Sequence, residues 1–113
     1  MLFRLLRSLF PRPSLEARRS SLWSTVRDRW IADHNRCEAC GTKDNLNVHH
    51  ERPFKYFPEL ELETSNFVTL CETPSRNCHL NVGHSGDWNA WNAHVRQDAA
   101  LMLQRRSERR YGR

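Results

Sequence analysis

Two stretches decide the fold, CEACGTKDNLNVHH at residues 37–50 and NFVTLCETPSRNCH at residues 66–79. They contain all 4 cysteines of the 113-residue chain and three of its 6 histidines. A chain this short buries a smaller fraction of its surface than a larger domain does, so its core needs additional stabilisation. The concentration of metal-ligating residue types in these two stretches therefore predicts a metal-stabilised domain.

Each stretch contains one predicted β-strand. Apolar and polar residues alternate over residues 46–50 (LNVHH), which favours a short strand that ends in two histidines. The aromatic and β-branched residues of 67–70 (FVTL) predict a second strand that delivers Cys71 at its end. Two prolines between the strands predict a long loop, because proline cannot donate a hydrogen bond to a sheet. A short helix is expected to begin at residues 78–79.

A helix is predicted on the N-terminal side of this core. It begins at Ser20, and Ser21 is the expected cap, because a serine hydroxyl can accept a hydrogen bond from the first turn of a helix. Leu22, Val26 and Trp30 follow at four-residue spacing and form an apolar stripe. We expect this stripe to pack against the metal-bound core.

A second helix is predicted on the C-terminal side. Gly83 and Gly86 interrupt the chain, after which Asp87 can cap a new helix. Tryptophans at helical spacing pack in a core more often than they stack on nucleic-acid bases, so core packing is the expected role of all 4 tryptophans. The expected apolar face of this helix comprises Trp88, Trp91, Val95 and Ala99.

The charge of the chain favours a polyanionic partner without naming it. Lys and Arg number 18 and Asp and Glu 13, a net charge of +5. We divide the chain into a basic N-terminal arm at residues 1–19, one domain at residues 20–104 and a basic C-terminal tail at residues 105–113. No internal repeat or low-complexity linker indicates a second domain. The tail is expected to be a solvated helix end carrying Arg105, Arg106, Arg109, Arg110 and Arg113.

Apolar runs are short throughout the chain. Within residues 1–13 (MLFRLLRSLFPRP) basic residues interrupt them too often for the apolar region of a signal peptide. No stretch approaches the roughly 20 apolar residues of a membrane span. We therefore expect a cytoplasmic protein without a membrane partner, in which cysteines persist as thiolates rather than disulfides.

The cysteines form two pairs that predict a structural zinc site. Cys37 and Cys40 have the Cys-x-x-Cys spacing that places two thiolates on one side of a zinc ion. Cys71 and Cys78 would close the other side, provided that residues 72–77 fold back between them. The alternatives are two disulfides or four unrelated buried cysteines, and neither explains why every cysteine borders a predicted turn or strand end. Zinc with four sulfur ligands has no open position for water and would stabilise the fold rather than catalyse.

Histidines and an asparagine are interleaved with these cysteines. Paired histidines end the first strand, Asn66 precedes the second strand, and His79 follows the last cysteine. This order resembles the HNH nuclease family, in particular a subgroup of small phage and bacterial HNH proteins. The resemblance implies an α+β fold, a zinc-stapled ββα-metal domain flanked by N- and C-terminal helices, and the function of a metal-dependent DNA endonuclease. The segments that carry it are CEACG, LNVHHERPF, SNFVTLC and NCHLNVGH, within residues 21–91.

The resemblance also implies a role for each residue. Phosphodiester hydrolysis needs a base that deprotonates water and a cation that neutralises charge on the phosphate and on the leaving oxygen. Neighbouring histidines on a strand point to opposite faces, so one can bind metal while the next acts as the base. By resemblance, His50 is the general base, Asn66 fixes the loop and orients His50, and His49 and His79 bind a divalent ion. Imidazole ligands suit Mn²⁺, Ni²⁺ and Zn²⁺, whereas Mg²⁺ usually takes more oxygen ligands, so the metal stays open.

Two positions depart from the family pattern. His84 is a candidate third ligand, but it lies five positions after His79 rather than the usual four, and it follows Gly83. Glu51 occupies a position that is often apolar in the family. A carboxylate beside His50 would favour the imidazolium form, which cannot act as a base, unless the carboxylate faces away.

Arg52, Lys55 and Arg76 are predicted to lie in loops beside the nuclease site, where they could contact DNA phosphates on either side of the scissile bond. His34 and His94 lie outside the motif and are assigned to helix surfaces or boundaries. Two alternative functions remain. A non-catalytic zinc module that binds nucleic acid would not cleave DNA with any metal, and its DNA binding would be unchanged by His50→Ala. A zinc-stabilised protein-interaction adaptor would show no salt-sensitive binding to DNA.

Overall fold

The computed structural model describes residues 18–111, and a two-stranded antiparallel sheet lies at its centre. Strand β1 (Leu46–His50) pairs with strand β2 (Phe67–Cys71). The register places His50 opposite Phe67 at the end of β1. Both strands coincide with the strands predicted from the sequence.

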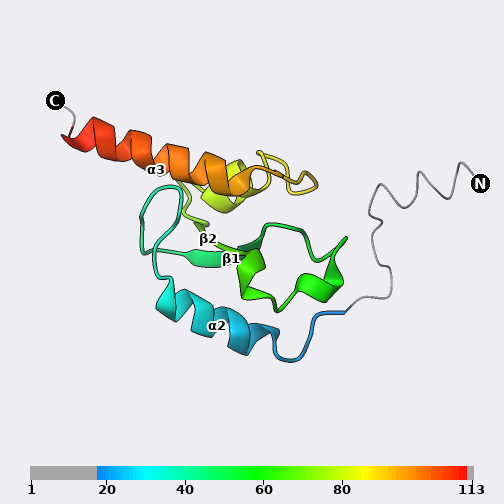
Figure 1. Cartoon of the computed structure of the whole chain (residues 1–113). Helices are drawn as coiled ribbons and strands as arrows, with labels where there is room; N and C mark the ends of the chain where they lie inside the picture. The colour runs from blue at the N-terminus through cyan, green and yellow to red at the C-terminus, as the bar shows by residue number, and fades with distance from the viewer. Residues whose placement is uncertain (1–17, 112–113) are drawn as a thin grey trace, which may run out of the picture.

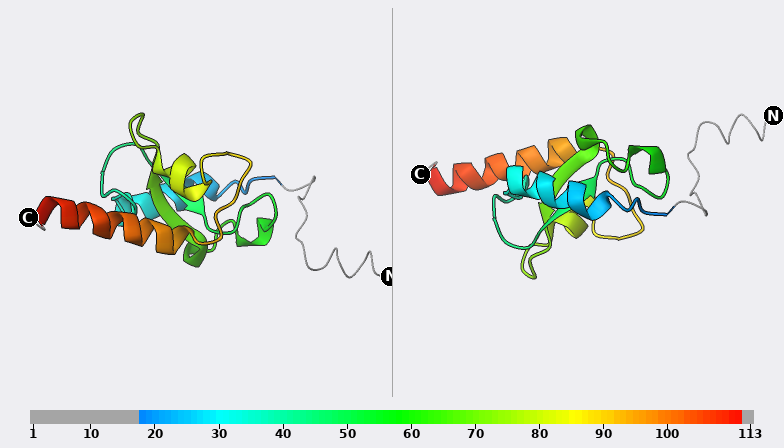
Figure 2. Two further views of the ribbon diagram at one scale, coloured as in Figure 1. Left: turned by 90° about the horizontal axis from the view of Figure 1, so that it is seen from above. Right: turned by 90° about the horizontal axis from the view of Figure 1, so that it is seen from below.

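Helical elements cover both faces of this sheet. Helix α2 (Trp23–Asp33) lies on one side, and helix α3 (Val95–Tyr111) lies on the other (Figure 1). A single π-helical turn, η3 (His79–Gly83), packs between α3 and the sheet. Seen from above α3 lies nearest the viewer, and seen from below α2 does (Figure 2). The molecule is therefore a small α+β domain with flanking helices, as predicted.

The two faces of the sheet have different neighbours. Phe67 faces α2, where its ring meets Trp30 edge to face at 5.4 Å, and His50, its cross-strand partner, lies on the same face. Burial of an aromatic side chain of this size contributes roughly 1.5–3 kcal/mol. Val68 and its partner His49 face the opposite way. Val68 belongs to the main apolar cluster, together with Leu70, Val82, Val95 and Ala99.

Helix α2 begins three residues later than predicted. Its first residue is Trp23, and Leu22 precedes it without any side-chain cap. Ser20 rather than Ser21 supplies a hydroxyl, which accepts a hydrogen bond from the Leu22 N–H (3.1 Å). The backbone N–H of Ser20 is itself bound by the Glu61 carboxylate (2.9 Å), which fixes this residue in the turn before the helix. The prediction of Ser21 as the cap is therefore wrong.

Helix α3 also begins later than predicted, at Val95 rather than near Asp87. The backbone of Ser85 (φ 53°) and Gly86 (φ 87°) is left-handed, a conformation that does not continue a helix. The Asp87 side chain accepts a hydrogen bond from the Asn89 N–H (2.9 Å), which stabilises a local turn instead of capping a helix. Residues 84–94 form a loop.

This later start changes the role of two tryptophans. Trp88 and Trp91 lie in the loop and are 50% and 36% exposed, so the prediction that they pack in the core is wrong. Val95 and Ala99 are buried as predicted. Trp23 and Trp30 are half-buried against the sheet.

The C-terminal tail continues α3 without a break as far as Tyr111. Within residues 18–111, no helix is long and apolar enough to cross a membrane. Arg113 and most of the predicted N-terminal arm lie outside the described residues. The arginines of the last turns are mostly exposed, as expected of a solvated helix end: Arg105, Arg106, Arg109 and Arg110.

The loop between the strands contains two short 3-10 turns, η1 (Pro58–Leu60) and η2 (Thr64–Asn66). Glu61 follows η1 and is only 4% exposed. Its carboxylate pairs with Arg19 (3.2 Å) in addition to the Ser20 N–H. Arg19 was predicted to belong to the arm, but this contact fixes it against the domain.

Candidate metal centres

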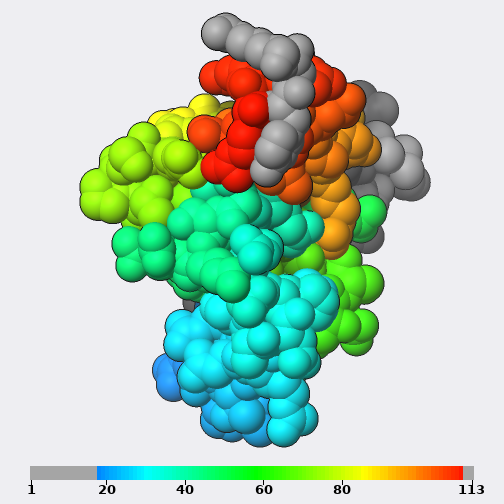
Figure 3. Space-filling view, turned by 90° about the vertical axis from the view of Figure 1, so that its left-hand side faces the viewer, coloured from blue at the N-terminus to red at the C-terminus, as the bar shows by residue number. Residues whose placement is uncertain are grey.

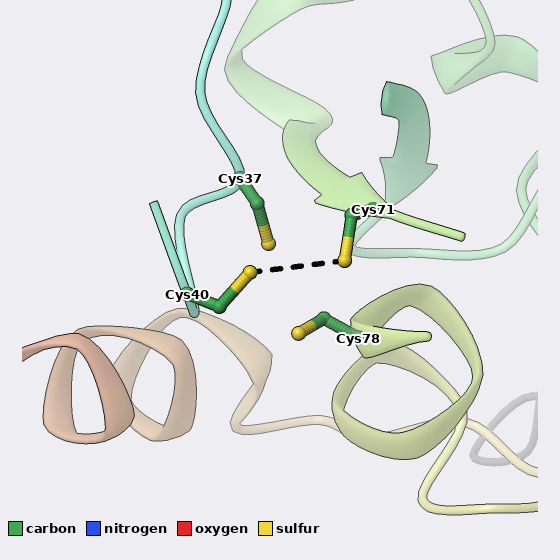
Figure 4. A group of neighbouring side chains, drawn as sticks. All are labelled: Cys37, Cys40, Cys71 and Cys78. Carbon is green, nitrogen blue, oxygen red and sulfur yellow. Dashed lines mark hydrogen bonds between the residues drawn. The ribbon is translucent and has the colours of Figure 1, made fainter. Parts of the chain in front are cut away.

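The four cysteines converge from three segments of the chain (Figure 4). Their sulfur atoms all lie within 4.8 Å of one another, and Cys40 Sγ lies 3.8 Å from Cys71 Sγ. Four thiolates at about 2.3 Å from a tetrahedral zinc ion are about 3.8 Å apart, whereas the sulfurs of a disulfide are about 2.0 Å apart. All four are free cysteines: Cys37, Cys40, Cys71 and Cys78. The cluster therefore fits a metal ion such as zinc and does not fit the alternative of two disulfides.

Two turns bring the sulfurs together. In the first, the Cys37 carbonyl accepts a hydrogen bond from the N–H of Gly41 (2.8 Å), whose φ of 80° suits glycine. In the second, residues 72–77 fold back as predicted, and the Asn77 N–H donates to the Thr73 carbonyl (2.8 Å). Because both turns are made by the backbone, the cluster is formed by the fold itself.

Hydrogen bonds shift the thiol pKa values within the cluster. A hydrogen bond with the Cys78 thiol is the largest cause that lowers the pKa of Cys37 to about 4, and backbone hydrogen bonds add to it, whereas burial opposes it. The same bond raises the pKa of Cys78. Burial raises the pKa of Cys71, but N–H groups directed at its sulfur outweigh burial and leave this pKa lowered. Cys37 and Cys71 are therefore the two cysteines whose thiolate form, the form that binds a cation, is favoured by their neighbours.

Arg76 lies at the cysteine cluster, not beside the histidines. Burial raises the pKa of Cys40, and a hydrogen bond from the Arg76 guanidinium opposes this rise. The prediction that Arg76 flanks the nuclease site is therefore wrong. The reason is the fold-back of residues 72–77, which turns Arg76 toward the sulfurs.

A second cluster consists of three histidines on the other face of the sheet from α2. His49 comes from β1, His79 begins η3, and His84 follows η3. One nitrogen of each ring lies within 4.8 Å of the other two. Burial, followed by the neighbouring histidines, lowers the pKa of His49 to about 3. Burial and His84 lower the pKa of His79 to about 4, so both rings are neutral near pH 7 and can offer lone pairs.

Two buried nitrogens of this cluster have no hydrogen-bond partner among the described residues, His49 Nε2 and His79 Nδ1, although Glu72 Oε1 lies 3.9 Å from the latter. An unsatisfied buried polar group costs about 1–3 kcal/mol, so native structures usually supply a partner. A bound cation would satisfy a lone pair directed into the cluster. The residues therefore fit a divalent metal that accepts imidazole ligands.

The π-helical turn explains the unusual spacing of His84. The His84 N–H donates to the carbonyls of His79 (3.1 Å) and Leu80 (3.2 Å). A π turn takes up more residues than an α turn, so a spacing of five returns His84 to the side of His79. The His84 Nδ1 donates to the Ala90 carbonyl (2.8 Å), which leaves Nε2 with the lone pair. Gly83 is required here, because a Cβ would lie 2.9 Å from His49 Nδ1.

His50 lies on the α2 face of β1, so the paired histidines point to opposite faces as predicted. Its ring lies 4.7 Å from that of Trp23 and 5.4 Å from that of Phe67. The His50 Nε2 donates to the Glu61 carbonyl (2.9 Å), so in the neutral ring the lone pair is on Nδ1. Burial lowers the pKa of His50 and outweighs the opposing effect of Glu61. His50 is therefore neutral near pH 7, the state that a general base requires.

Asn66 holds the chain just after β1. Its side-chain Oδ1 accepts a hydrogen bond from the Arg52 N–H (2.8 Å), and its Nδ2 donates to the Arg52 carbonyl (3.0 Å). The ring of His50, however, is oriented by Glu61, a residue that sequence reasoning missed because no spacing pattern marks it. Glu51 pairs with Arg96 of α3 (2.6 Å) and is absent from the groups that shift the pKa of His50.

The three histidines of the cluster and His50 line one hollow of about 330 Å³: His49, His50, His79 and His84. Of the predicted phosphate contacts, Lys55 also lines it, whereas the Arg52 guanidinium lies over the ring of Phe57 at 5.5 Å. Arg19, which the sequence analysis had placed in the arm, is a further cation in its wall. His94 is exposed and His34 stacks on Trp30 (3.5 Å), outside the cluster in both cases.

Comparison of the chain with protein-family models, with curated proteins and with solved structures finds no match. The interpretation of the two clusters therefore rests on their own geometry and on the motifs in the sequence.

Proposed function

We propose that this protein is a metal-dependent DNA endonuclease of the HNH type. One observation carries the proposal: three histidine nitrogens converge on one face of β1, while a neutral, fixed His50 on the other face lines the same hollow. The hollow thus contains both groups that phosphodiester hydrolysis needs, a base that is not a metal ligand and a set of ligands for a cation. The resemblance of the cysteine, histidine and asparagine motifs to the HNH family supports the same activity.

The residues in and around the histidine hollow would have separate roles in hydrolysis. His50 Nδ1 would accept a proton from the attacking water, while the Glu61 carbonyl holds the ring through Nε2. Asn66 would keep the loop after β1 in place. Lys55 would hold a phosphate at the wall of the hollow. A divalent ion held by His49, His79 and His84 would supply positive charge for the phosphate and the leaving oxygen.

The metal requirement tests this proposal directly. We expect the protein to bind one divalent ion in addition to the metal of the cysteine cluster, and to nick plasmid DNA only when that ion is present. His79→Ala should weaken binding of the second ion at least about tenfold, because it removes one of three ligands, and should lower cleavage in parallel. Isothermal titration with Mn²⁺ and Ni²⁺ and a plasmid assay measure both effects.

The matched control for this variant is His94→Ala, which removes an exposed histidine outside the hollow. It should leave metal binding and cleavage unchanged. If the second ion binds but no metal supports cleavage, and DNA binding is salt-sensitive, the non-catalytic nucleic-acid-binding module replaces the nuclease. If no salt-sensitive DNA binding is seen either, the protein-interaction adaptor remains.

A basic surface supports DNA as the partner. A hollow of about 780 Å³ lies over the cysteine cluster, and Figure 3 shows this end of the molecule, where the last turns of α3 lie beside the loop before β1. Within residues 18–111 none of the arginines in the wall of this hollow forms an ion pair with a carboxylate. Apart from Arg76, which hydrogen-bonds to the Cys40 sulfur, their charge is available to a polyanion. The arginines in its wall are Arg36, Arg76, Arg106, Arg109 and Arg110.

Neutralising this surface should reduce the salt dependence of DNA binding. Each phosphate contact contributes a slope of about −0.9 to log Kobs against log salt concentration, so replacing Arg106, Arg109 and Arg110 by glutamine should flatten the slope by up to about 3. Fluorescence anisotropy with a duplex oligonucleotide at several salt concentrations measures this slope. A control with the same net charge replaces Arg18, Arg27 and Arg29, which do not line this hollow. Equal flattening in both variants would contradict a specific role for the α3 arginines.

A further inference from the structure

The loop of residues 84–94 exposes aromatic surface at the mouth of the histidine hollow. Trp88 and Trp91 are 50% and 36% exposed and both line the hollow. Exposed apolar groups that border a candidate site are a common mark of ligand contact.

Both rings are held in place, which distinguishes them from a mobile surface. The Trp88 ring lies 5.1 Å from that of His79, edge to face, and 5.0 Å from that of His84. The Trp91 indole N–H donates to the Glu51 carbonyl (2.7 Å). Its ring lies nearly parallel to Tyr56, with an interplanar angle of 20° and centroids 6.2 Å apart. A fixed ring loses little conformational freedom when a ligand binds.

We infer that Trp88, in the wall of the same hollow as Trp91 and Tyr56, is a stacking platform for an unpaired nucleobase beside the scissile phosphate. The inference deepens the proposed function and rests on it, because it names the substrate class as DNA with unpaired bases. In a paired duplex the faces of each base are covered by its neighbours, so only a single-stranded or extruded base can stack on a side chain. Lys55 in the wall of the same hollow supplies positive charge for an adjoining phosphate.

Binding to defined oligonucleotides tests this inference without any cleavage. The full-length protein, with metal in the cysteine cluster and none added for the histidines, is titrated with a thymidine 12-mer and with a hairpin duplex. Trp88→Ala should weaken binding of the single strand about tenfold or more and binding of the duplex less than twofold, because stacking contributes only to the former. Trp88→Phe should restore most of the affinity, because phenylalanine keeps an aromatic face. Quenching of tryptophan fluorescence by the single strand should be smaller in Trp88→Ala than in the wild type.

Equal losses for single strand and duplex, or no loss for either, would overturn the inference and leave Trp88 as a cover over His79 and His84. If Trp88→Ala is misfolded, Trp88→Phe and the fluorescence of the wild type decide: absence of quenching by the single strand overturns the inference. The failure of the proposed function gives a different result. If single strands are preferred in a Trp88-dependent way but no metal supports cleavage, the stacking platform is retained and the nuclease is rejected. If both substrates are cleaved equally well with and without Trp88, the nuclease is retained and the platform is rejected.

Discussion

Removing the metal from the cysteine cluster is expected to unfold the domain. Three of the four cysteines are 0–1% exposed and belong to the main apolar cluster, so the cysteine cluster and the core are one structure. Structural zinc contributes an apparent free energy of roughly 10–16 kcal/mol in small zinc domains, which equals or exceeds the whole stability of a typical domain of about 5–15 kcal/mol. A strong chelator should release one zinc ion per chain and abolish the cooperative thermal transition seen by circular dichroism.

Two variants separate this effect from the histidine cluster. Cys71→Ser should lose zinc and the cooperative transition, because Cys71 ends β2 and is fully buried. His79→Ala should keep both, since it removes a ligand of the other cluster only. A cooperative transition that persists after complete removal of zinc would show that the apolar core is sufficient by itself. Native mass spectrometry counts the ions bound before and after chelation.

The features that could be predicted from the sequence are those with a local pattern. Alternation and β-branched residues located both strands, and the Cys-x-x-Cys spacing located the first half of the cysteine cluster. The fold-back that brings Cys78 to Cys71 followed from chemistry, because two distant thiolates can share an ion only if residues 72–77 reverse direction. The opposite orientation of His49 and His50 followed from the pleat of a strand alone.

Other features depend on contacts that have no local pattern. The Glu61 carboxylate anchors Ser20, which delays the start of α2, and its carbonyl orients His50. Neither contact can be inferred from a glutamate in a loop. Arg76 is predicted to lie in a loop beside the histidine site, but the turn of the backbone directs it to Cys40 instead. The exposure of Trp88 depends on left-handed backbone at Ser85, a position where sequence favours no such conformation strongly.

The π turn η3 makes the unusual spacing between His79 and His84 compatible with a three-histidine metal site. The interval of five between His79 and His84 conflicts with an α-helix, in which residues four apart share a side. The bifurcated hydrogen bond from the His84 N–H to His79 and Leu80 accommodates the extra residue. Gly83 is part of the same arrangement, because it leaves room for the His49 ring. Three histidines therefore converge, whereas the family spacing in the sequence supports only His49 and His79 as ligands.

Replacing His50 should abolish cleavage while leaving both metal clusters intact. Loss of a general base lowers hydrolysis by about 10²–10⁴-fold. His50 lies on the opposite face of β1 from His49, so His50→Ala should not weaken binding of a divalent ion to the three-histidine cluster. DNA affinity should also stay within about twofold of the wild type, because His50 is neutral and contributes no charge to phosphate binding. Plasmid cleavage, metal titration and fluorescence anisotropy on one preparation measure the three quantities.

His50→Gln is the sharper variant, because its side-chain amide can still donate to the Glu61 carbonyl that His50 Nε2 binds. Glutamine has no nitrogen that accepts a proton near pH 7, so cleavage should fall as far as in His50→Ala, while the unfolding temperature changes less. The exposed His94→Ala variant should cleave like the wild type. If His50→Gln is folded, binds metal and retains more than about a tenth of wild-type cleavage, His50 is not the base. The role of His50 would then be to hold the loop through its hydrogen bond to Glu61. Another group in the hollow would have to activate the water.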